Sequence, residues 1–453
     1  MELSKIHNIY FVGIGGIGMS ALASYFVANG KQVSGYDKTP TEVTNRLREQ
    51  GVAISFVDDI VSVEAPFLQL DKTLVVYTPA IPEDSKILTN FRQRGFQVLK
   101  RAALLGLITK NTICYAVAGT HGKTTTSSIL GHIMHVCGTQ ATSFLGGITE
   151  NYHSNLILGG DKISVVEADE FDRSFLQLSP NVACITNMDA DHLDIYGEQS
   201  ALEASFKDFA GKVSDTLIVK KGLPVNGLTY AVEENADYIA QRVRIEKGSF
   251  VFDVKTPNGF IGDIIFHLPG RHNVSNALVS IAMAEKQGLS LEEIKEALSS
   301  YKGVKRRFSY KIKQDDLVLI DDYAHHPAEI EAVENTVREM YPDQKVLVIF
   351  QPHLYTRTRD FADDFARSLS SFDEVILLDI YPAREVQIEG VDSKWLLNKI
   401  RHKKKSLKTK SATVNDIKST DATVIVMLGA GDIGVLAEEV KAALDDRKEK
   451  KVS

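Results

Sequence analysis

Residues 112–126 read Thr-Ile-Cys-Tyr-Ala-Val-Ala-Gly-Thr-His-Gly-Lys-Thr-Thr-Thr, an apolar run that leads into a glycine-rich loop. This order is typical of a buried strand, a phosphate-binding loop and a helix. Gly119 and Gly122 would let backbone N–H groups approach phosphate oxygens. Lys123 would reach the β- and γ-phosphates, and the Thr124 hydroxyl would ligate Mg²⁺. The stretch therefore predicts an α/β domain that binds ATP.

The predicted ATP loop consists of Gly119, Thr120, His121, Gly122, Lys123, Thr124 and Thr125. It departs from the generic phosphate-loop spacing because Val117 occupies the position five before Gly122, which leaves Gly119 as the first flexible point. The alternative is a plain glycine turn between a buried strand and a helix. Chance seldom places Gly-Lys-Thr directly behind an apolar strand, so we favour the phosphate loop.

Length and composition indicate a multidomain globular protein. At 453 residues the chain exceeds one hydrophobic core, and we expect roughly two to four domains, with three as the working number. Hydrophobic residues at 44% and charged residues at 25% are ordinary globular values. The net charge of −7 gives no reason to expect a nucleic-acid partner. We interpret the basic run 399–410 as a solvated face because no aromatic residues are interleaved with it.

The cysteines and the apolar segments favour the cytoplasm. Cys114, Cys137 and Cys184 have no spacing for a disulfide framework or a metal site, which fits a reducing compartment. Residues 9–28 are uncharged, but four glycines in their first half favour a strand, a turn and a buried helix over a membrane span. We therefore expect a protein that is neither exported nor anchored in a membrane.

The first hundred residues alternate apolar strand patterns with helical patterns, which predicts a parallel sheet covered by helices. The predicted strands are 8–12, 32–36 and 73–77, and the predicted helices are 18–29 and 42–50. Residues 13–18 fit Gly-x-Gly-x-x-Gly between the first strand and helix, and Asp37 ends the next strand where a ribose-binding acid would lie. Residues 429–434 fit the same pattern, and there we favour a tight strand-to-helix turn.

Two further α/β segments follow. The second begins near residue 111 and has predicted strands at 162–167 and 182–186. The third begins after residues 302–304 and has predicted strands at 317–321, 345–350, 374–378 and 423–428. The predicted domains are 1–108, 109–304 and 305–453: a Rossmann-like domain, a central phosphate-loop domain with a mostly parallel sheet, and a second Rossmann-like domain.

Acidic residues follow the strand at 162–167, in the sequence Glu-Ala-Asp-Glu-Phe-Asp at 167–172. The carboxyl ends of parallel strands form the rim where α/β sheets bind ligands. Mg²⁺ takes hard oxygen ligands and shares phosphate oxygens, so Glu167 is the predicted partner of Thr124. A solvated acidic turn is the alternative. After the next strand, His192 lies among three aspartates, where a neutral imidazole could ligate a second cation.

Later polar blocks also lie at predicted strand ends or helix starts. Asn276 opens a helix rich in small residues, where an Asn amide could read adenine, although a helix cap at Asn273 explains the block equally well. Arg307 stands at the expected joint between domains, Asp322 and His325 follow one strand, and Arg357 follows another. Such loops supply cations and donors that grip phosphate or carboxylate groups.

Taken together and in this order, these blocks resemble the Mur ligase family over essentially the whole chain. The blocks are Gly-Ile-Gly-Gly-Ile-Gly-Met-Ser at 13–20, Gly-Thr-His-Gly-Lys-Thr-Thr-Thr at 119–126, Asp-Ala-Asp-His at 189–192, Gly-Arg-His-Asn at 270–273, Asp-Asp-Tyr-Ala-His-His-Pro at 321–327 and Gln-Pro-His at 351–353. The resemblance implies a UDP-binding domain, an ATPase domain and a Rossmann-like C-terminal domain. It also implies that ATP phosphorylates a carboxylate and that an amine then attacks the acyl phosphate.

The resemblance implies a role for each matching residue. Gly15, Gly16, Ile17 and Asp37 would hold the uridine nucleotide, and Lys123 and Thr124 the ATP phosphates. Glu167 and His192 would each hold a magnesium ion. Asn276 would contact adenine, Arg307 the phosphates and Asp322 the ribose, while His325 and Arg357 would orient the carboxylate or the amino acid. Two positions depart from the family pattern: Phe171 replaces a small residue, and Leu354 stands where many relatives carry Arg, which Arg359 could partly replace.

The implied substrates are UDP-N-acetylmuramate and L-alanine, with ATP and Mg²⁺. Within the family the alternative is the ligase that reattaches a recycled peptide to the same sugar acid. Two alternatives come from other classes. A nicotinamide-dependent oxidoreductase would explain the glycines at 13–18 but not the phosphate loop, and an ATP-switched binding module would not need the later His and Arg blocks. The oligomeric state is open, with a homodimer as one candidate.

Overall fold

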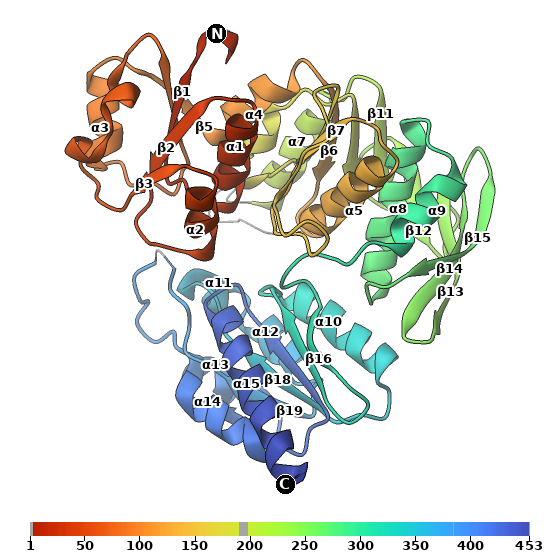
Figure 1. Ribbon diagram of the computed structural model, residues 1–453. Helices are drawn as coiled ribbons and strands as arrows, with labels where there is room; N and C mark the ends of the chain where they lie inside the picture. The colour runs from red at the N-terminus through yellow and green to blue at the C-terminus, as the bar shows by residue number, and fades with distance from the viewer. Residues whose placement is uncertain (1–2, 190–197, 384, 453) are drawn as a thin grey trace. The chain divides into compact units, whose positions relative to one another are not determined.

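Three sheets organise the chain into a three-domain α/β architecture (Figure 1). The structure is a computed structural model that describes residues 3–189, 198–383 and 385–452, with side chains described up to residue 445. The predicted α/β fold class is confirmed, and each sheet is built mainly from parallel strands.

The first sheet has five parallel strands in the order β3-β2-β1-β4-β5. Residue Asn8 pairs with both Gln32 and Thr73, which places the first strand at the centre. The three strands predicted in this segment lie at the predicted residues. The elements are β1 (Asn8–Val12), α1 (Ile17–Ala28), β2 (Gln32–Tyr36), α2 (Glu42–Glu49), β3 (Ala53–Ser55), β4 (Thr73–Tyr77), α3 (Lys86–Gln93), β5 (Gln97–Lys100) and α4 (Arg101–Thr109).

The second sheet has ten strands in the order β15-β14-β13-β12-β11-β10-β6-β9-β7-β8. The predicted strands at 162–167 and 182–186 correspond to β9 and β10, whereas β7, β8 and β11 to β15 were not predicted. The elements are β6 (Ile113–Ala118), α5 (Lys123–Val136), β7 (Ala141–Phe144), β8 (Leu156–Ile157), β9 (Ile163–Glu167), the 3₁₀ helix η4 (Phe171–Gln177), β10 (Val182–Ile185), α7 (Gln199–Ala210), β11 (Thr216–Lys220), β12 (Leu228–Val232), β13 (Tyr238–Glu246), β14 (Ser249–Lys255), β15 (Phe260–Phe266), α8 (Arg271–Lys286) and α9 (Leu291–Ser299).

The third sheet has six strands in the order β16-β17-β21-β18-β19-β20, and only the pairing of β16 with β17 is antiparallel. Its four predicted strands match β17, β18, β19 and β21 to within one residue at each end. The elements are β16 (Ser309–Lys313), β17 (Val318–Asp322), α10 (Pro327–Met340), β18 (Val346–Phe350), α11 (Tyr355–Asp360), α12 (Ala362–Leu369), β19 (Glu374–Leu377), α13 (Ser393–Lys399), β20 (Lys405–Leu407), α14 (Lys410–Asp416), β21 (Val424–Leu428) and α15 (Ile433–Val452).

Apolar packing groups the sheets into two compact units. The first consists of residues 1–243, 252–265 and 275–302, and the second of 244–251, 266–274 and 303–453. One core cluster joins the first two sheets, because Ile9 and Phe11 of β1 belong to the same cluster as Ala116 and Ala118 of β6. The predicted boundaries at 108/109 and 304/305 stay predictions.

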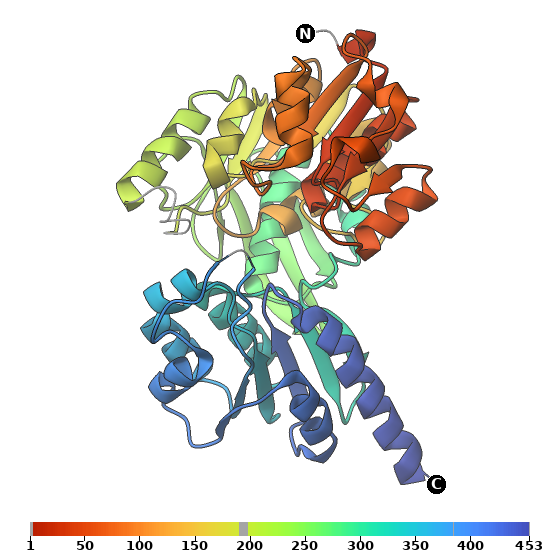
Figure 2. The ribbon, with the colours of Figure 1, turned by 90° about the vertical axis from the view of Figure 1, so that its left-hand side faces the viewer.

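The third sheet is covered on both faces. One core includes Val348 of β18 and Val337 of α10, and the opposite core includes Leu319 of β17 and Val440 of α15. Figure 2 shows α15 lying along one face of this sheet. This two-sided burial explains why β18 and β21 read as uninterrupted apolar runs.

The glycine pattern at 429–434 forms a tight turn between β21 and α15, as predicted. Arg306 fills this turn, since its guanidinium donates to the carbonyls of Gly429 at 2.6 Å and Gly431 at 3.2 Å. Gln351 also binds it by donating to Asp432 and accepting from the Ile433 N–H. Side chains of the chain itself therefore take the place that a phosphate would need.

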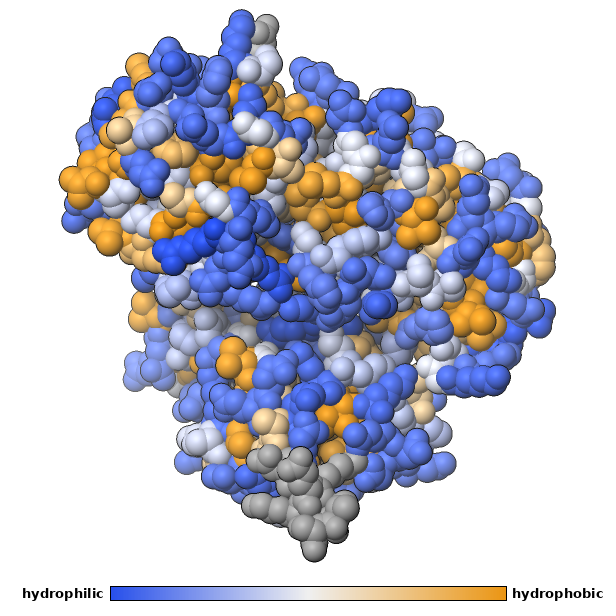
Figure 3. All heavy atoms as spheres, in the orientation of Figure 1, coloured by the Kyte–Doolittle hydropathy of each residue, from blue (hydrophilic) through white to orange (hydrophobic). Residues whose placement is uncertain are grey.

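The surface agrees with the composition. Figure 3 shows that hydrophilic residues cover most of the visible face, with hydrophobic residues in scattered groups. In the basic run, Lys399 pairs with Asp363, and Lys408 pairs with Asp416. Within the described part of the chain, no helix has the length and apolar character needed to span a bilayer.

We expect Gly106→Ala to destabilise the protein, although alanine favours helices by about 1 kcal/mol. A Cβ at Gly106 in α4 would lie 2.5 Å from the backbone oxygen of Gln177, the last residue of η4. Because a backbone atom cannot rotate away, overpacking should give a net loss of about 1–2 kcal/mol in the free energy of unfolding. Urea unfolding followed by circular dichroism measures the loss. Gly211→Ala is the control, since a Cβ there meets nothing closer than 3.5 Å, and an equal effect of both variants would contradict the packing argument.

Candidate active site

The candidate site forms where three parallel strands of the second sheet end side by side. Val117 of β6 is paired with Glu167 of β9, and Ala118 is paired with Ile185 of β10. The loop between β6 and α5 starts at this edge, and Gly122 is the N-cap of α5 without a side-chain capping bond. The first-turn N–H groups of a helix have no acceptor within the helix, so this edge can bind an anion.

Two loop glycines are required by close contacts. Gly119 has φ +133°, and a Cβ there would lie 2.0 Å from the Thr186 hydroxyl oxygen. Gly122 has φ +81°, and a Cβ there would lie 2.7 Å from the Asn276 side-chain oxygen. The predicted adenine contact therefore lies directly against the loop, in the same compact unit.

Asn187 fixes the loop, although sequence analysis gave it no role. Its side-chain oxygen accepts from the Thr120 hydroxyl at 2.9 Å and from the His121 N–H at 2.8 Å. The Thr120 hydroxyl in turn accepts from the Asp189 N–H at 3.1 Å. Asn187 lies two residues after the end of β10, at the sheet edge where ligands bind, and this position could have identified it as a site residue.

Glu167 meets Thr124 as predicted. The Thr124 hydroxyl lies 3.0 Å from each carboxylate oxygen of Glu167. A Cβ on Gly146 would lie 2.1 Å from one of these oxygens, so the Gly-Gly pair after β7 leaves room for the carboxylate. A hydroxyl and a carboxylate in contact form a hard-oxygen pair of the kind that Mg²⁺ prefers.

Lys123 is hydrogen-bonded to other residues of the chain. Its ammonium donates to both carboxylate oxygens of Glu170, at 2.7 and 2.9 Å, and to the Gly119 carbonyl at 2.8 Å. Burial by itself would lower the pKa of Lys123, but the charges of Glu170, Asp169 and Glu167 raise it above its usual value. The lysine is therefore a permanent cation at the strand edge.

The N-terminal glycine loop also contacts its predicted acid. Asp37 accepts a hydrogen bond of 2.7 Å from the Gly15 N–H. A Cβ on Gly15 would lie 2.8 Å from the Asp37 carboxylate. Gly16 is the N-cap of α1 without a side-chain capping bond, so the N–H groups that begin with Ile17 point out of the helix start.

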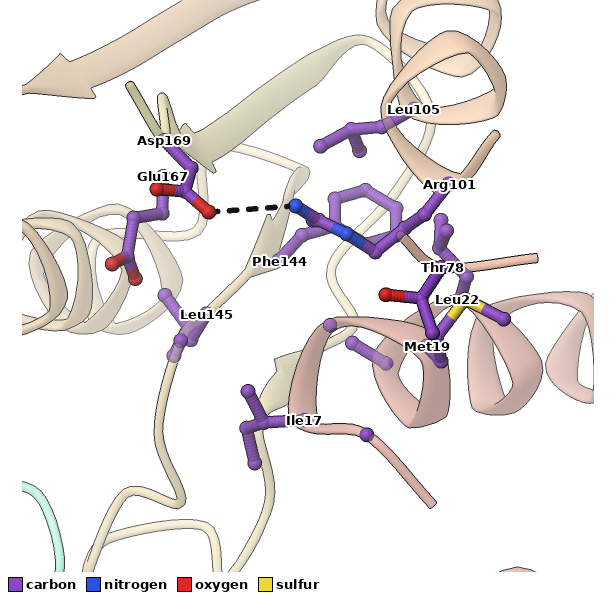
Figure 4. Close-up of a pocket in the computed structure, with 14 residues that line it drawn as sticks. Ile17, Met19, Leu22, Thr78, Arg101, Leu105, Phe144, Leu145, Glu167 and Asp169 are labelled. Atoms are coloured by element: carbon purple, nitrogen blue, oxygen red, sulfur yellow. Dashed lines mark ion pairs between the residues drawn. The ribbon is translucent and has the colours of Figure 1, made fainter. Parts of the chain in front are cut away.

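A cavity of about 280 Å³ connects the two predicted sites within the first unit. Its lining includes Gly16 and Ile17 at the start of α1, and Glu167 and Asp169 at the end of β9. Figure 4 shows Arg101 of α4 pointing toward Asp169, and their closest charged atoms are 3.7 Å apart. Arg101 was not predicted to belong to the site, because a single arginine at a helix start has no motif around it.

The predicted residues of the C-terminal segment gather in the second unit. The His325 side chain lies next to the Glu329 carboxylate at 3.3 Å and is 18% exposed. Burial lowers the pKa of His325 to about 4, with Arg357 and Arg307 acting in the same direction and Glu329 opposing them. His325 is therefore a neutral imidazole at pH 7.

Asp322 is held mainly by backbone donors. Its carboxylate accepts from the Phe308 N–H at 2.6 Å and the Ala324 N–H at 2.7 Å. Burial raises the pKa of Asp322 to about 6, against the opposing effects of Arg307 and these two donors. A role for Asp322 in ribose binding stays a prediction.

The two departures from the family pattern have local consequences. Leu354 has φ +71° directly before α11, an uncommon conformation for a leucine, and its N–H donates to the Tyr381 carbonyl at 3.0 Å. Phe171 starts η4 and donates its N–H to Asp169 at 3.2 Å. Leu354 thus sets the start of the helix that carries Arg357.

The predicted ligand His192 lies outside the described residues. Among the residues that are described, no group of three or more His, Cys, Asp or Glu side chains could hold a metal ion. The hydroxyl and carboxylate pair of Thr124 and Glu167 is the part of the predicted metal site that the structure describes.

Known proteins match nearly the whole chain. Sequence models described as "Mur ligase family, catalytic domain", "Mur ligase middle domain" and "Mur ligase, glutamate ligase domain" match residues 8–112, 117–284 and 306–437. The UDP-N-acetylmuramate–L-alanine ligase of Flavobacterium psychrophilum is 56% identical over 99% of this chain and 100% of its own length.

Solved structures show the same likeness. The crystal structure of the UDP-N-acetylmuramate–alanine ligase of Thermotoga maritima is 28% identical, with a TM-score of 0.82 over 98% of this chain and 99% of that one. A murein peptide ligase of Psychrobacter arcticus is 23% identical, with a TM-score of 0.70 over 97% and 98% of the two chains, and shows the fold alone.

The low pKa of His325 predicts a pH dependence of stability. The unfolded imidazole has a pKa of about 6.5, so between pH 4 and 6.5 the unfolded chain binds more protons than the folded chain. Stability should therefore fall as the pH falls through this window, by about 2–3 kcal/mol from His325 alone. His325→Gln should remove that part of the loss. The measurement is the free energy of unfolding in urea at pH 7 and at pH 4.5, and the drop between the two should be smaller for the variant than for the parent.

Asp322 also contributes to the pH dependence: its raised pKa makes stability increase as the pH falls from about 6 to 4. This contribution is present in both variant and parent, so subtracting one from the other removes it. His267→Gln, which removes an exposed imidazole from the same unit, is the control and should keep the full loss. If His325→Gln loses as much stability in acid as the parent does, His325 is not neutral in the fold.

Proposed function

The chain belongs to the Mur ligase family, and we propose that it joins L-alanine to the carboxylate of UDP-N-acetylmuramate, with conversion of ATP to ADP and phosphate. The observation that carries the proposal is the meeting of Lys123, Thr124 and Glu167 at one sheet edge. The 56% identity to a ligase with this activity supports the choice of substrates.

The chemistry needs positioning and positive charge more than a protein nucleophile. A carboxylate is a poor electrophile because its charge is delocalised, and phosphorylation by ATP gives it a leaving group. The α-amine of alanine then attacks the acyl carbon, forms the amide bond and releases phosphate. Lys123 and the first-turn N–H groups of α5 would stabilise the charge on the transferred phosphoryl group.

The residues fit a magnesium ion. Thr124 and Glu167 supply a hydroxyl and a carboxylate 3.0 Å apart, and Mg²⁺ typically binds through one or two such groups plus substrate phosphates. When bound, Mg²⁺ would neutralise charge on the phosphates. We keep His192 as the proposed ligand of a second ion, on the resemblance to the family.

The cavity between the start of α1 and the end of β9 would accommodate the sugar substrate. We propose that the uridine nucleotide binds at Gly15, Gly16, Ile17 and Asp37. The cavity that starts at this loop ends at Glu167 and Asp169, next to the phosphate loop, in the same unit. A substrate whose nucleotide lies at the start of α1 would thus direct its carboxylate toward the γ-phosphate.

The second unit is proposed to supply the remaining contacts. Arg307 and Asp322 would bind ATP, and Arg357 would orient the carboxylate or the amino acid. A neutral His325 can accept a hydrogen bond or a proton from the incoming amine. The division into domains 1–108, 109–304 and 305–453 is part of the proposal, as are a cytoplasmic location, a homodimer and the absence of a nucleic-acid or membrane partner.

Two alternatives are less favoured. The recycling ligase shares the fold, but the 56% identity of nearly the whole chain to a UDP-N-acetylmuramate–L-alanine ligase favours alanine as the substrate. A nicotinamide-dependent oxidoreductase would leave the phosphate loop at 119–125, with the contacts of Lys123 and Thr124, unexplained.

Lys123→Ala should abolish ATP-dependent phosphate release, and circular dichroism should accompany the assay because the variant also takes the buried Glu170 carboxylate out of its ion pair. Loss of this clamp should cost on the order of 3 kcal/mol of transition-state stabilisation, or at least a hundredfold in rate. Phosphate release with UDP-N-acetylmuramate and L-alanine measures the effect. Lys86→Ala is the matched control, because Lys86 also opens a helix, α3, but is exposed. Normal turnover in folded Lys123→Ala would rule out the proposed ATP site.

The N-terminal loop should recognise a UDP sugar and not a nicotinamide cofactor. UDP-N-acetylmuramate at a hundredfold excess over its dissociation constant should raise the free energy of unfolding by about 2.7 kcal/mol. NADH should give no protection. Thermal unfolding with each ligand makes the comparison, and protection by NADH alone would reverse the assignment.

A further inference from the structure

We propose that Glu170 is a positioning residue that competes with nucleotide phosphates for the ammonium of Lys123 and thereby weakens nucleotide binding enough for ADP to leave. The inference rests on the proposed function, because it takes the loop at 119–125 as the ATP site. Nothing in the family resemblance gave Glu170 a role.

The hydrogen bonds of Lys123 carry the argument. An ammonium has three N–H bonds, and four oxygens of the chain lie within reach: both Glu170 carboxylate oxygens, the Gly119 carbonyl and, at 3.4 Å, the Thr120 carbonyl. A phosphate oxygen can therefore bind Lys123 only by displacing one of these acceptors. Glu170 is the strongest of them, because it is fully buried and charged.

The side chain of Glu170 is fully buried and its backbone is anchored, so moving the carboxylate away from Lys123 would require its neighbours to repack. Its carbonyl accepts from the Arg173 N–H at 2.9 Å at the start of η4. Further along η4, Phe175 is buried and its ring lies 5.3 Å from that of Phe206 and 5.0 Å from that of Phe209, both on α7. The position of Glu170 is thus set by the core of the domain.

Competition of this kind has a kinetic consequence. While Glu170 holds the ammonium, a phosphate can contact Lys123 only by breaking an existing ion pair. Each such contact therefore adds less to the binding free energy of the nucleotide. The product ADP then dissociates readily. Replacing Glu170 by a neutral side chain of the same shape should tighten the binding of both nucleotides and make product release slow.

The test compares Glu170→Gln with Asp169→Asn. Both remove one negative charge near Lys123, but Asp169 makes no hydrogen bond to it. Calorimetric titration with ADP and Mg²⁺ should show about tenfold tighter binding for Glu170→Gln and less than about threefold for Asp169→Asn. The KM for ATP and kcat of Glu170→Gln should both fall, and rapid mixing should show a burst of phosphate that the parent lacks.

Equal tightening in both variants would mean that only the charge matters, and unchanged or weaker binding in Glu170→Gln would mean that Glu170 is purely structural. Either result overturns the proposal. If the parent protein does not bind ADP at all, the proposed ATP site fails instead. Should Glu170→Gln not fold, Lys123→Met/Glu170→Gln removes both members of the ion pair and leaves neither buried charge without it. Without the ammonium there is nothing for Glu170 to compete for, so this double variant should bind ADP no more tightly than the parent. Tighter binding than in the parent would mean that Glu170 acts by repelling phosphates and would refute competition through Lys123.

Discussion

The pairing of β6 with β9 places Val117 opposite Glu167, and this register determines where the acids of the site stand relative to the phosphate loop. Strand β6 ends one residue later, and the loop that begins there brings Lys123 and Thr124 back over the end of β9. A slip by one residue would turn Glu167 to the other face of the sheet. Thr124 would then lose both of its contacts to the carboxylate.

Close approach at this edge depends on three glycines from two segments, the phosphate loop and the turn after β7. Gly119 admits the Thr186 hydroxyl, Gly122 admits the Asn276 amide and Gly146 admits the Glu167 carboxylate. Each would have a Cβ within 2.7 Å of its neighbour. The glycines therefore do more than bend the loop, because they allow Thr186 just after β10, Asn276 of α8 and Glu167 of β9 to reach the place where phosphates would bind.

The parallel core was predictable because both faces of it are buried. Strands such as β1, β18 and β21 read as continuous apolar runs between turn signals, and their ends were correct to within one residue. Strands β13 and β15 give no continuous apolar run because they mix buried and exposed residues. Strand β14 is buried along most of its length, but Asp253 interrupts its apolar run.

Within the site, motif residues such as Lys123, Thr124 and Glu167 could be identified from spacing. Arg101, Asn187 and Glu170 could not be given roles, since their partners come from distant parts of the chain and only tertiary packing brings them together.

Charge explains why a phosphate-binding lysine is surrounded by acids. Glu167, Asp169 and Glu170 face Lys123 and Arg101, so three carboxylates meet two cations and leave one net negative charge. A triphosphate adds further negative charge, and it can enter only if positive charge arrives with it or an existing ion pair is exchanged. Magnesium at Thr124 and Glu167 would bring the positive charge, and at Lys123 a phosphate would replace Glu170 in the ion pair. Nucleotide affinity is therefore set by a balance of charges, and the acids that hold the loop in place also keep product binding weak, as a ligase that releases ADP in every cycle requires.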